Sequence, residues 1–301
     1  MAGRKNEEGT PAFKPTVIDL FCGAGGLSCG FRQAGFSVLA GIDNWEDALV
    51  TYRRNFPETK TLNADIENIT AKKIDTILGD RAGNVDVIVG GPPCQGFSVS
   101  GKRLLNDPRN KLYKAFVSLV EHYKPKLFVM ENVPGVMRLF GGKVKEQIIA
   151  DFSAIGYNVE TKLLSAENYG VPLSVAVPKI DIDDKKYYFS ERAVLGLKKA
   201  KNNMKRGLAQ NPDEPCLTVT SHLAKISLNS RDPVLLVDPA KELYRRFTPR
   251  EAARIQSFPD TFKFEVSEFD SYKQIENAIP PVMFWHIAKS VSDFLTDEVK
   301  K

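Results

Sequence analysis

The chain has 301 residues, of which 43% are hydrophobic and 26% are charged, and its formal net charge is +5. This composition is typical of an ordinary globular protein, and no apolar run is long enough to span a membrane. The 4 cysteines show no C-x-x-C spacing and the 3 histidines are scattered, which disfavours a disulfide framework or a zinc site. The mild positive charge is compatible with a polyanionic partner without requiring one.

The first half of the chain alternates short apolar runs with amphipathic segments. Residues 1–15 have no apolar signal core, and we expect a mobile tail there. The predicted strands are 16–21, 38–43, 86–91, 126–133 and 157–164, and the predicted helices are 45–56, 110–123 and 143–155. This alternation predicts an α/β fold, namely a doubly wound, mostly parallel sheet with helices on both faces. Ligands of such sheets bind outside the carboxyl ends of the strands.

The alternation of apolar runs and amphipathic segments is not found between residues 173 and 240, where Lys, Asn, Ser and Asp are frequent. We interpret this stretch as a smaller basic region and residues 16–172 as the core. A helix is then predicted after Thr248, which is suited to capping it. Pro249 suits the first turn, and Glu251 stands three residues after the cap. We expect residues 241–301 to return to the core and complete it.

Three segments of the first half are candidates for binding a nucleoside. The glycine-rich "FCGAGG" follows the first strand and would let a ligand approach the start of the next helix, although a plain tight turn fits as well. Asp43 ends the second strand, where an acid commonly accepts hydrogen bonds from ribose hydroxyls, and capping of the following helix is the alternative. Asp65 is suited to accept from an adenine amino group, or it is simply solvated.

Cys94 and Glu131 are the candidates for chemistry. In "VIVGGPPCQGFS", Cys94 lies just past an apolar strand, on a turn that Pro92 and Pro93 stiffen. A thiolate there would be a nucleophile, and an inert buried thiol is the alternative. Glu131 ends another strand, so a parallel sheet brings it to the same edge. A carboxyl among apolar residues has a raised pKa and can donate a proton, whereas capping or ion pairing is the alternative.

Five segments, taken together and in this order, resemble the motifs of the cytosine-5 DNA methyltransferases. They cover most of residues 16 to 290 and read "DLFCGAGGLSCGF", "GGPPCQGFS", "MENVPG", "YRRFTPREAARIQSFPDTF" and "QIENAIPP". The resemblance implies a Rossmann-like methyltransferase core of prokaryotic restriction–modification type. It also implies transfer of a methyl group from S-adenosylmethionine to carbon 5 of cytosine in a specific duplex sequence.

The resemblance assigns roles to individual residues. Cys94 would add to carbon 6 of a flipped cytosine, and Glu131 would contact the ring nitrogen and the exocyclic amine. The implied S-adenosylmethionine site consists of Phe21, Gly23, Gly25, Leu27, Asp43, Asn44, Asp65, Ile66, Pro92 and Asn277. Residues 173–240 correspond to a shortened target-recognition region. The expected contacts with duplex DNA are Gln95, Ser98, Lys198, Lys199, Lys201, Lys205, Arg206, Ser230 and Arg231.

The expected setting is that of a cytoplasmic, nucleoid-associated monomer with no membrane partner. A restriction endonuclease acting on the same site is a further expected partner. No metal site is expected.

Two departures from the family pattern keep alternatives open. After "AENYGVP" the family continues with Gln-Arg-Arg and an apolar strand, whereas this chain has "LSVAVPKIDIDDKKYYF" and no arginine until Arg192. Glu276 stands where the family has glycine, and a positive φ there would strain the turn. The alternatives are a catalytically weak or inactive DNA- or cofactor-binding relative and an RNA cytosine methyltransferase. A nicotinamide dehydrogenase is disfavoured because it leaves Cys94 and Glu131 unexplained.

Overall fold

A computed structural model describes residues 14–93, 111–171, 182–200, 209, 216, 223 and 234–299. Its central feature is a sheet of five strands in the order β3-β2-β1-β4-β5, and every neighbouring pair is parallel. The strands are β1 (Thr16–Leu20), β2 (Ser37–Asp43), β3 (Lys60–Asn63), β4 (Val87–Gly90) and β5 (Leu127–Met130). The predicted doubly wound parallel sheet is confirmed, although the short polar β3 was not anticipated.

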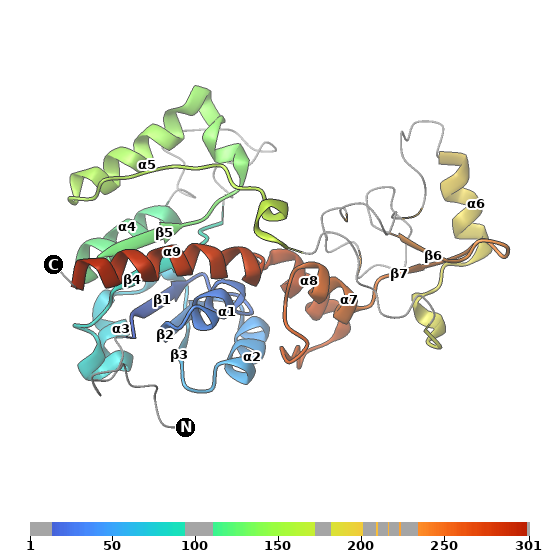
Figure 1. The fold of residues 1–301 in the computed structure, drawn as a ribbon, viewed down its shortest axis with the longest axis horizontal. Helices are drawn as coiled ribbons and strands as arrows, with labels where there is room; N and C mark the ends of the chain where they lie inside the picture. The colour runs from blue at the N-terminus through green and yellow to red at the C-terminus, as the bar shows by residue number, and fades with distance from the viewer. Residues whose placement is uncertain are drawn as a thin grey trace.

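Helices cover both faces of this sheet, because neighbouring residues of a strand point to opposite sides. Val17 belongs to a buried cluster with Phe31 and Phe284, from the helices α1 and α9. Ile18 faces the other way, into a cluster built largely from α3, α4 and α5. The helices of the core are α1 (Gly26–Gln33), α2 (Glu46–Asn55), α3 (Ala71–Leu78), α4 (Lys111–Tyr123), α5 (Lys143–Ala154) and α9 (Pro281–Val299). Figure 1 shows α9 running along the sheet.

The segment after α5 departs from expectation. Residues 157–164 were predicted as a strand, but the structure assigns them no regular secondary structure, so that prediction is wrong. A strand needs a hydrogen-bonded neighbour, and β5 pairs only with β4 in the described part of the chain. Tyr157 packs instead at the edge of the Phe128 ring and donates a hydrogen bond to the Pro125 carbonyl.

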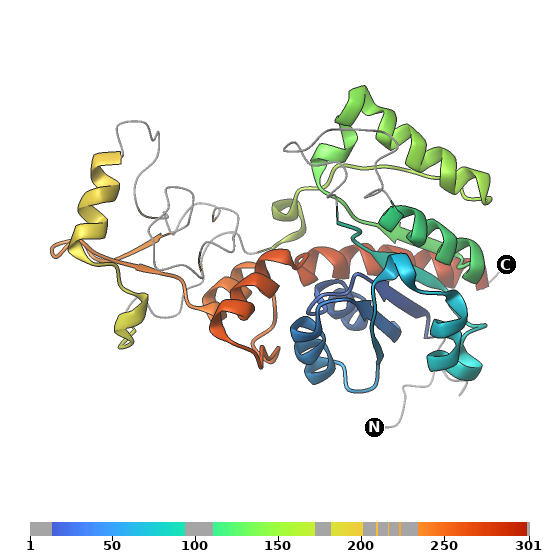
Figure 2. The ribbon, with the colours of Figure 1, turned by 180° about the vertical axis from the view of Figure 1, so that it is seen from behind.

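A smaller lobe lies at the other end of the molecule. It contains the antiparallel pair β6 (Val234–Asp238) and β7 (Leu243–Arg246), together with α6 (Glu191–Ala200). The helices α7 (Pro249–Ile255) and α8 (Glu268–Asn277) lie between this lobe and the sheet in both views (Figures 1 and 2). The predicted capping box of α7 is confirmed: Thr248 Oγ1 accepts from the Glu251 N–H, and the Thr248 N–H donates to Glu251 Oε2.

Short 3₁₀ segments complete the described secondary structure. They are η1 (Ile66–Asn68), η2 (Gly79–Arg81), η5 (Pro134–Met137), η6 (Leu139–Gly142), η7 (Ala166–Tyr169) and η8 (Lys185–Tyr187). Among the described helices, none has both the length and the apolar character needed to cross a bilayer.

Candidate active site

A cavity of about 580 Å³ opens at the carboxyl ends of all five parallel strands, where this class of sheet binds ligands. The loop after each strand contributes to its wall, and the end of α8 closes one side. The lining residues are Phe21, Cys22, Gly23, Ala24, Gly26, Leu27, Asp43, Asn44, Trp45, Ala64, Asp65, Ile66, Gly91, Pro92, Pro93, Leu112, Glu131, Asn132, Val133, Lys273, Gln274, Asn277, Ala278 and Ile279. Every predicted cofactor residue except Gly25 is among them.

The turn between β1 and α1 bends sharply around the cavity. The backbone φ is 61° at Phe21, 49° at Gly23 and 102° at Gly25, all in the left-handed region. A positive φ is uncommon for an aromatic residue, and such strain is often found at functional sites. At Gly25 a Cβ would lie 2.4 Å from the Phe56 ring, so only glycine fits. Gly25 therefore contributes to the shape of the turn through its backbone conformation and does not line the cavity.

Asp43 ties the end of β2 to this turn. Its Oδ2 accepts a hydrogen bond from the Gly23 N–H at 2.8 Å, and its Oδ1 accepts from the Trp45 N–H at 2.9 Å. Burial raises the pKa of Asp43, and these hydrogen bonds oppose the rise. The cap position of α2 is occupied by Trp45, which makes no side-chain capping bond, so the alternative of Asp43 as the helix cap is wrong.

The remaining predicted cofactor residues come from three separate elements. Asp65 is exposed at the cavity rim and caps η1, since its Oδ1 accepts from the Glu67 N–H at 3.1 Å. Ile66 is 2% exposed and supplies an apolar surface beside it. Asn277 is the last residue of α8, and Asn44 follows β2. Tertiary folding thus gathers acidic, amide and apolar side chains around one cavity.

Glu131 directly follows β5 and faces the loop that leads towards Cys94. Its backbone N–H donates to the Gly90 carbonyl at 2.9 Å. A Cβ on Gly91 would lie 3.1 Å from Glu131 Oε2, so the carboxyl lies against the backbone of that glycine. Burial raises the pKa of Glu131, and no described residue donates a hydrogen bond to its carboxyl group. The group is therefore suited to hold a proton and to pass it to a ligand.

The loop after β4 is fixed to the loop after β5. Asn132 Nδ2 donates to the Pro92 carbonyl at 3.0 Å, and both Pro92 and Pro93 line the cavity. Cys94, Gln95 and Ser98 lie outside the described residues. Pro93, the residue before Cys94, lines the same cavity as Glu131.

Among the lining residues that were not anticipated from the sequence are Trp45, Lys273 and Gln274. The Lys273 ammonium lies 4.3 Å from the centroid of the Trp45 ring, and Gln274 Nε2 donates to the Asp47 carbonyl at 2.9 Å. Trp45 follows the predicted second strand by two residues, and Gln274 opens the motif that contains Asn277. These residues could have been predicted to line the site only from their position next to the recognised motifs.

The predicted DNA contacts are largely outside the described part of the chain. Lys198 lies on α6 in the smaller lobe, where its ammonium pairs with Glu242. Lys199 also belongs to α6. The other expected contacts (Lys201, Lys205, Arg206, Ser230 and Arg231) fall outside the described residues.

Glu276 lies within α8, has no positive φ and does not line the cavity, so the condition under which it would strain a turn is not met. The described residues contain no group of His, Cys, Asp and Glu placed to hold a metal ion.

Comparison with known proteins agrees with this geometry. The family model for the C-5 cytosine-specific DNA methylases matches residues 15–174 and 180–293. The type II methyltransferase M.FnuDI of Fusobacterium nucleatum is 31% identical over 340 residues, covering 94% of this chain and 96% of that protein. M.AgeI of Thalassovita gelatinovora is 48% identical over 156 residues, covering 52% of this chain but 36% of that relative.

Solved structures show the same fold. A prophage-encoded protein of Escherichia coli, assigned as a DNA modification methyltransferase, is 25% identical with a TM-score of 0.72, covering 94% of this chain and 100% of that one. The Dnmt2 methyltransferase of S. pombe also has a TM-score of 0.72, at 19% identity, covering 93% of this chain and 99% of that one. At that identity the second comparison supports the fold alone.

Proposed function

The chain belongs to the C-5 cytosine-specific DNA methylases, and on that premise we propose how its residues methylate cytosine in duplex DNA. The resemblance found in the sequence motifs is thereby confirmed. Enzymes of this family take the methyl group from S-adenosylmethionine. One observation carries the proposal. The Glu131 carboxyl and the loop leading to Cys94 line the same cavity as the acidic and apolar residues expected to bind a nucleoside.

The lining of the cavity fits S-adenosylmethionine. Its volume of about 580 Å³ lies in the usual range for cofactor sites. Asp43 and Asp65 offer carboxylate oxygens to hydroxyl and amino groups, while Phe21, Leu27 and Ile66 offer apolar surface to a purine ring. When bound, this cofactor supplies an electrophilic methyl group on a positively charged sulfur, and the acidic lining favours that charge.

We assign the chemistry to two residues. The thiolate of Cys94 forms a bond to carbon 6 of cytosine, and the electron pair of the 5,6 double bond moves towards carbon 5. Glu131 holds a proton against the ring nitrogen, which accommodates that charge. Carbon 5 then gains the methyl group as the bond between the methyl carbon and sulfur breaks, which leaves a neutral thioether. The proton on carbon 5 is lost to a base, and the Cys94 thiolate is eliminated as the 5,6 double bond forms again. Because the base must reach the cavity, it leaves the duplex stack.

The division of the chain, its oligomeric state, its location and its partner are proposed by analogy with the relatives. We infer that the smaller lobe, formed by residues 173–240 together with β7, recognises the target sequence, and that residues 16–172 and the helices α7 to α9 form the catalytic core. The protein would act as a monomer on nucleoid DNA in the cytoplasm. A cognate restriction endonuclease would cut the same sequence, as expected for a relative of type II methyltransferases.

Trapping with a modified base tests the proposal. Duplex DNA containing 5-fluorocytosine keeps the thiol adduct, since fluorine does not leave as a proton does. The wild-type chain with labelled S-adenosylmethionine should give a denaturation-resistant complex, and Cys94→Ser should give none. Cys29→Ser is the matched control, because Cys29 is fully buried in α1. A complex that persists in Cys94→Ser, or transfer to transfer RNA with none to DNA, would overturn the proposal.

A further inference from the structure

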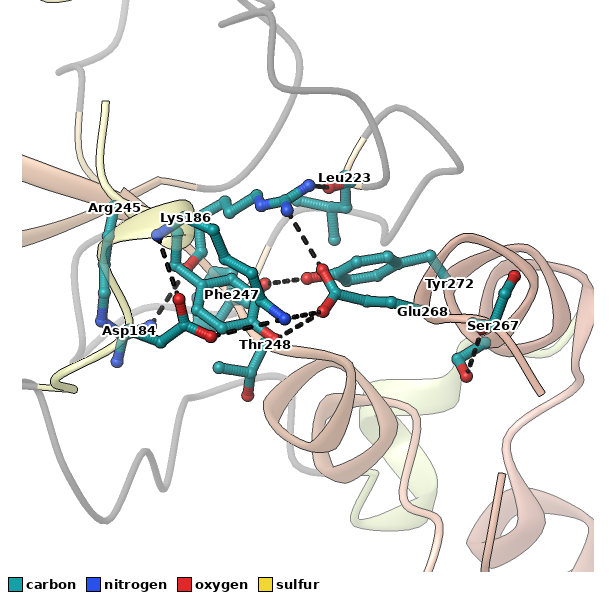
Figure 3. A network of polar contacts seen from close by, with 12 residues as sticks. Asp184, Lys186, Leu223, Arg245, Phe247, Thr248, Ser267, Glu268 and Tyr272 are labelled. Carbon is teal, nitrogen blue, oxygen red and sulfur yellow. Dashed lines mark hydrogen bonds and ion pairs between the residues drawn. The ribbon is translucent and has the colours of Figure 1, made fainter. Parts of the chain in front are cut away.

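Helix α8 carries an acidic group at its first residue that is held by the smaller lobe. Glu268 Oε1 accepts a hydrogen bond from Arg246 Nη2 at 3.1 Å. Its Oε2 accepts from the Tyr187 hydroxyl at 2.8 Å and pairs with the Lys186 ammonium at 2.7 Å. Arg246 ends β7, and the other two residues belong to η8. Figure 3 shows the Glu268 carboxyl at the centre of these contacts.

The contact between Arg246 and Glu268 is largely shielded from water. The side chains are 8% and 28% exposed, respectively. Arg246 also donates to the Leu223 carbonyl at 2.9 Å, and its guanidinium lies over the rings of Tyr187 and Tyr272. Removing the carboxylate would leave a buried cation with fewer partners, which is costly. The lobe is therefore firmly connected to the start of α8.

The opposite end of α8 belongs to the cofactor cavity. Lys273, Gln274 and Asn277 line that cavity, and a helix of 10 residues is only about 15 Å long. Gln274 donates to the Asp47 carbonyl, which attaches this end to α2. The side chain of Gln256 in turn donates to the carbonyls of Ile275 and Ala278, both at 3.2 Å. One short helix thus joins the lobe to the wall of the cavity.

We propose that Glu268 is a positioning residue that couples binding of DNA by the smaller lobe to binding of S-adenosylmethionine in the cavity. This inference rests on the proposed function of that lobe. A shift of β7 or η8 on DNA acts on Glu268, moves α8 as a unit and changes the position of Gln274 and Asn277. Because coupling between two sites is reciprocal, cofactor binding also affects the lobe in the absence of DNA.

The test compares Glu268→Gln with Glu265→Gln in the full chain. Glutamine keeps the size of the side chain but removes its charge. Glu265 is a matched control because it lies three residues earlier and pairs with Arg54 of α2, away from the lobe. The first measurement is the Kd of S-adenosylmethionine by calorimetry, without and with a duplex that the wild-type chain methylates.

We expect DNA to lower the cofactor Kd of the wild-type chain and of Glu265→Gln by about fivefold or more. In Glu268→Gln the change should be less than about twofold, with the cofactor Kd in the absence of DNA within about twofold of wild type. Wild-type coupling in Glu268→Gln would overturn the proposal. So would an equal loss of cofactor affinity with and without DNA, because that indicates a purely structural role.

A second measurement needs no DNA and separates this inference from the proposed function. Hydrogen exchange of the full chain is followed with and without S-adenosylmethionine. Cofactor binding should slow exchange in residues 185–187 and 243–246 of the wild-type chain and of Glu265→Gln, but not of Glu268→Gln. Protection that is equal in all three chains, or absent from the wild-type lobe, contradicts the coupling. A failure to bind or methylate DNA counts against the proposed function instead.

Discussion

The two edges of the central sheet are built differently. At one edge β3 reads Lys-Thr-Leu-Asn, and its first and last residues are exposed, as expected for a strand that ends a sheet. At the other edge β5 reads Leu-Phe-Val-Met, an apolar run typical of an interior strand, yet all four residues are half-buried. The neighbouring β4 is fully buried. The sequence of β5 is therefore suited to a further neighbour that the described chain does not supply.

The same division separates two parts of the site. The β3 side contributes Asp43 and Asp65, which we assign to the cofactor. The β5 side contributes Glu131 and, through the adjoining loop, leads to Cys94, which we assign to the reaction. The segment in which the sequence departs from the family, after Pro172, lies outside the described residues. We therefore expect binding of the cofactor to depend on the β3 side of the sheet and turnover to depend on the β5 side.

The sharpest test of this division is Glu131→Gln. Glutamine retains the contact with Gly91 but cannot transfer a proton, so kcat is expected to fall about 10²- to 10⁴-fold. The affinity for S-adenosylmethionine, measured by calorimetry, should stay within about twofold because the β3 side is untouched. Glu121→Gln, at an exposed position of α4, is the control. Unchanged single-turnover transfer in Glu131→Gln would exclude this residue from the chemistry.

Restoring the family's segment after Pro172 should have the next largest effect. A Gln-Arg-Arg segment followed by an apolar strand, inserted after Pro172, would restore the charged groups and the neighbour that the family pattern contains. Hydrogen bonds to charged groups stabilise by about 1.5–3 kcal/mol each, so turnover should rise roughly 10- to 10³-fold. A glycine–serine insertion of equal length is the control. If the unmodified chain already turns over about once a minute or faster, the segment after Pro172 does not limit turnover.

The sequence predicted the interior of the sheet better than its margins. β1, β2 and β4 are apolar runs that lead to a glycine-rich turn, to Asp43 and to Gly91, respectively, so both their burial and the residues at their carboxyl ends could be inferred. β3 was missed because its four residues carry little apolar signal and pair with β2 through the backbone. Residues 157–164 have strand-like composition, but strand formation depends on a partner, which local pattern does not reveal.

Within the site, sequence reasoning found residues on the loops after strands and missed contacts between distant segments. Lys273 reaches the Trp45 ring across more than 200 positions of the chain, and no local pattern encodes that approach. The network at Glu268 was missed for the same reason, because its partners come from η8 and β7.

On the β3 side, Asp43→Ala should weaken binding of S-adenosylmethionine roughly tenfold or more. The variant loses acceptors for ligand hydroxyls as well as the bond to the Gly23 N–H, a loss on the order of 1–3 kcal/mol. Calorimetry measures the affinity, and kcat at saturating cofactor should fall less than the affinity does. Asp80→Ala, in the exposed part of η2, controls for loss of an acidic charge. Equal affinity in the two variants would remove Asp43 from the cofactor site.

The smallest effect is expected at Asp19, in β1 between the two edges. This residue is fully buried; its Oδ2 accepts from the Ser28 N–H and hydroxyl, while its Oδ1 has no hydrogen-bond partner. Burial raises the pKa of Asp19 to about 7. Between its ordinary value near 4 and about 7, the folded chain therefore keeps a proton that the unfolded chain releases. Within that window this carboxyl makes the folded state less stable as pH rises, by about 1.4 kcal/mol per pH unit.

Asp19→Asn has no proton to release at this position, so its free energy of unfolding should improve relative to wild type as pH rises. Urea unfolding of both chains at pH 5 and pH 6 is expected to show a change in their difference of about 1 kcal/mol. Glu268 acts in the opposite sense: burial alone would raise its pKa, but hydrogen bonds from Lys186 and Tyr187 lower it overall. The stability that Glu268 contributes is lost as pH falls. This loss cancels in the difference between the wild type and Asp19→Asn, because both chains contain Glu268. Parallel pH profiles for the two chains would show that Asp19 is ionised in the folded protein, and that water or a nearby group compensates its charge in the centre of the sheet.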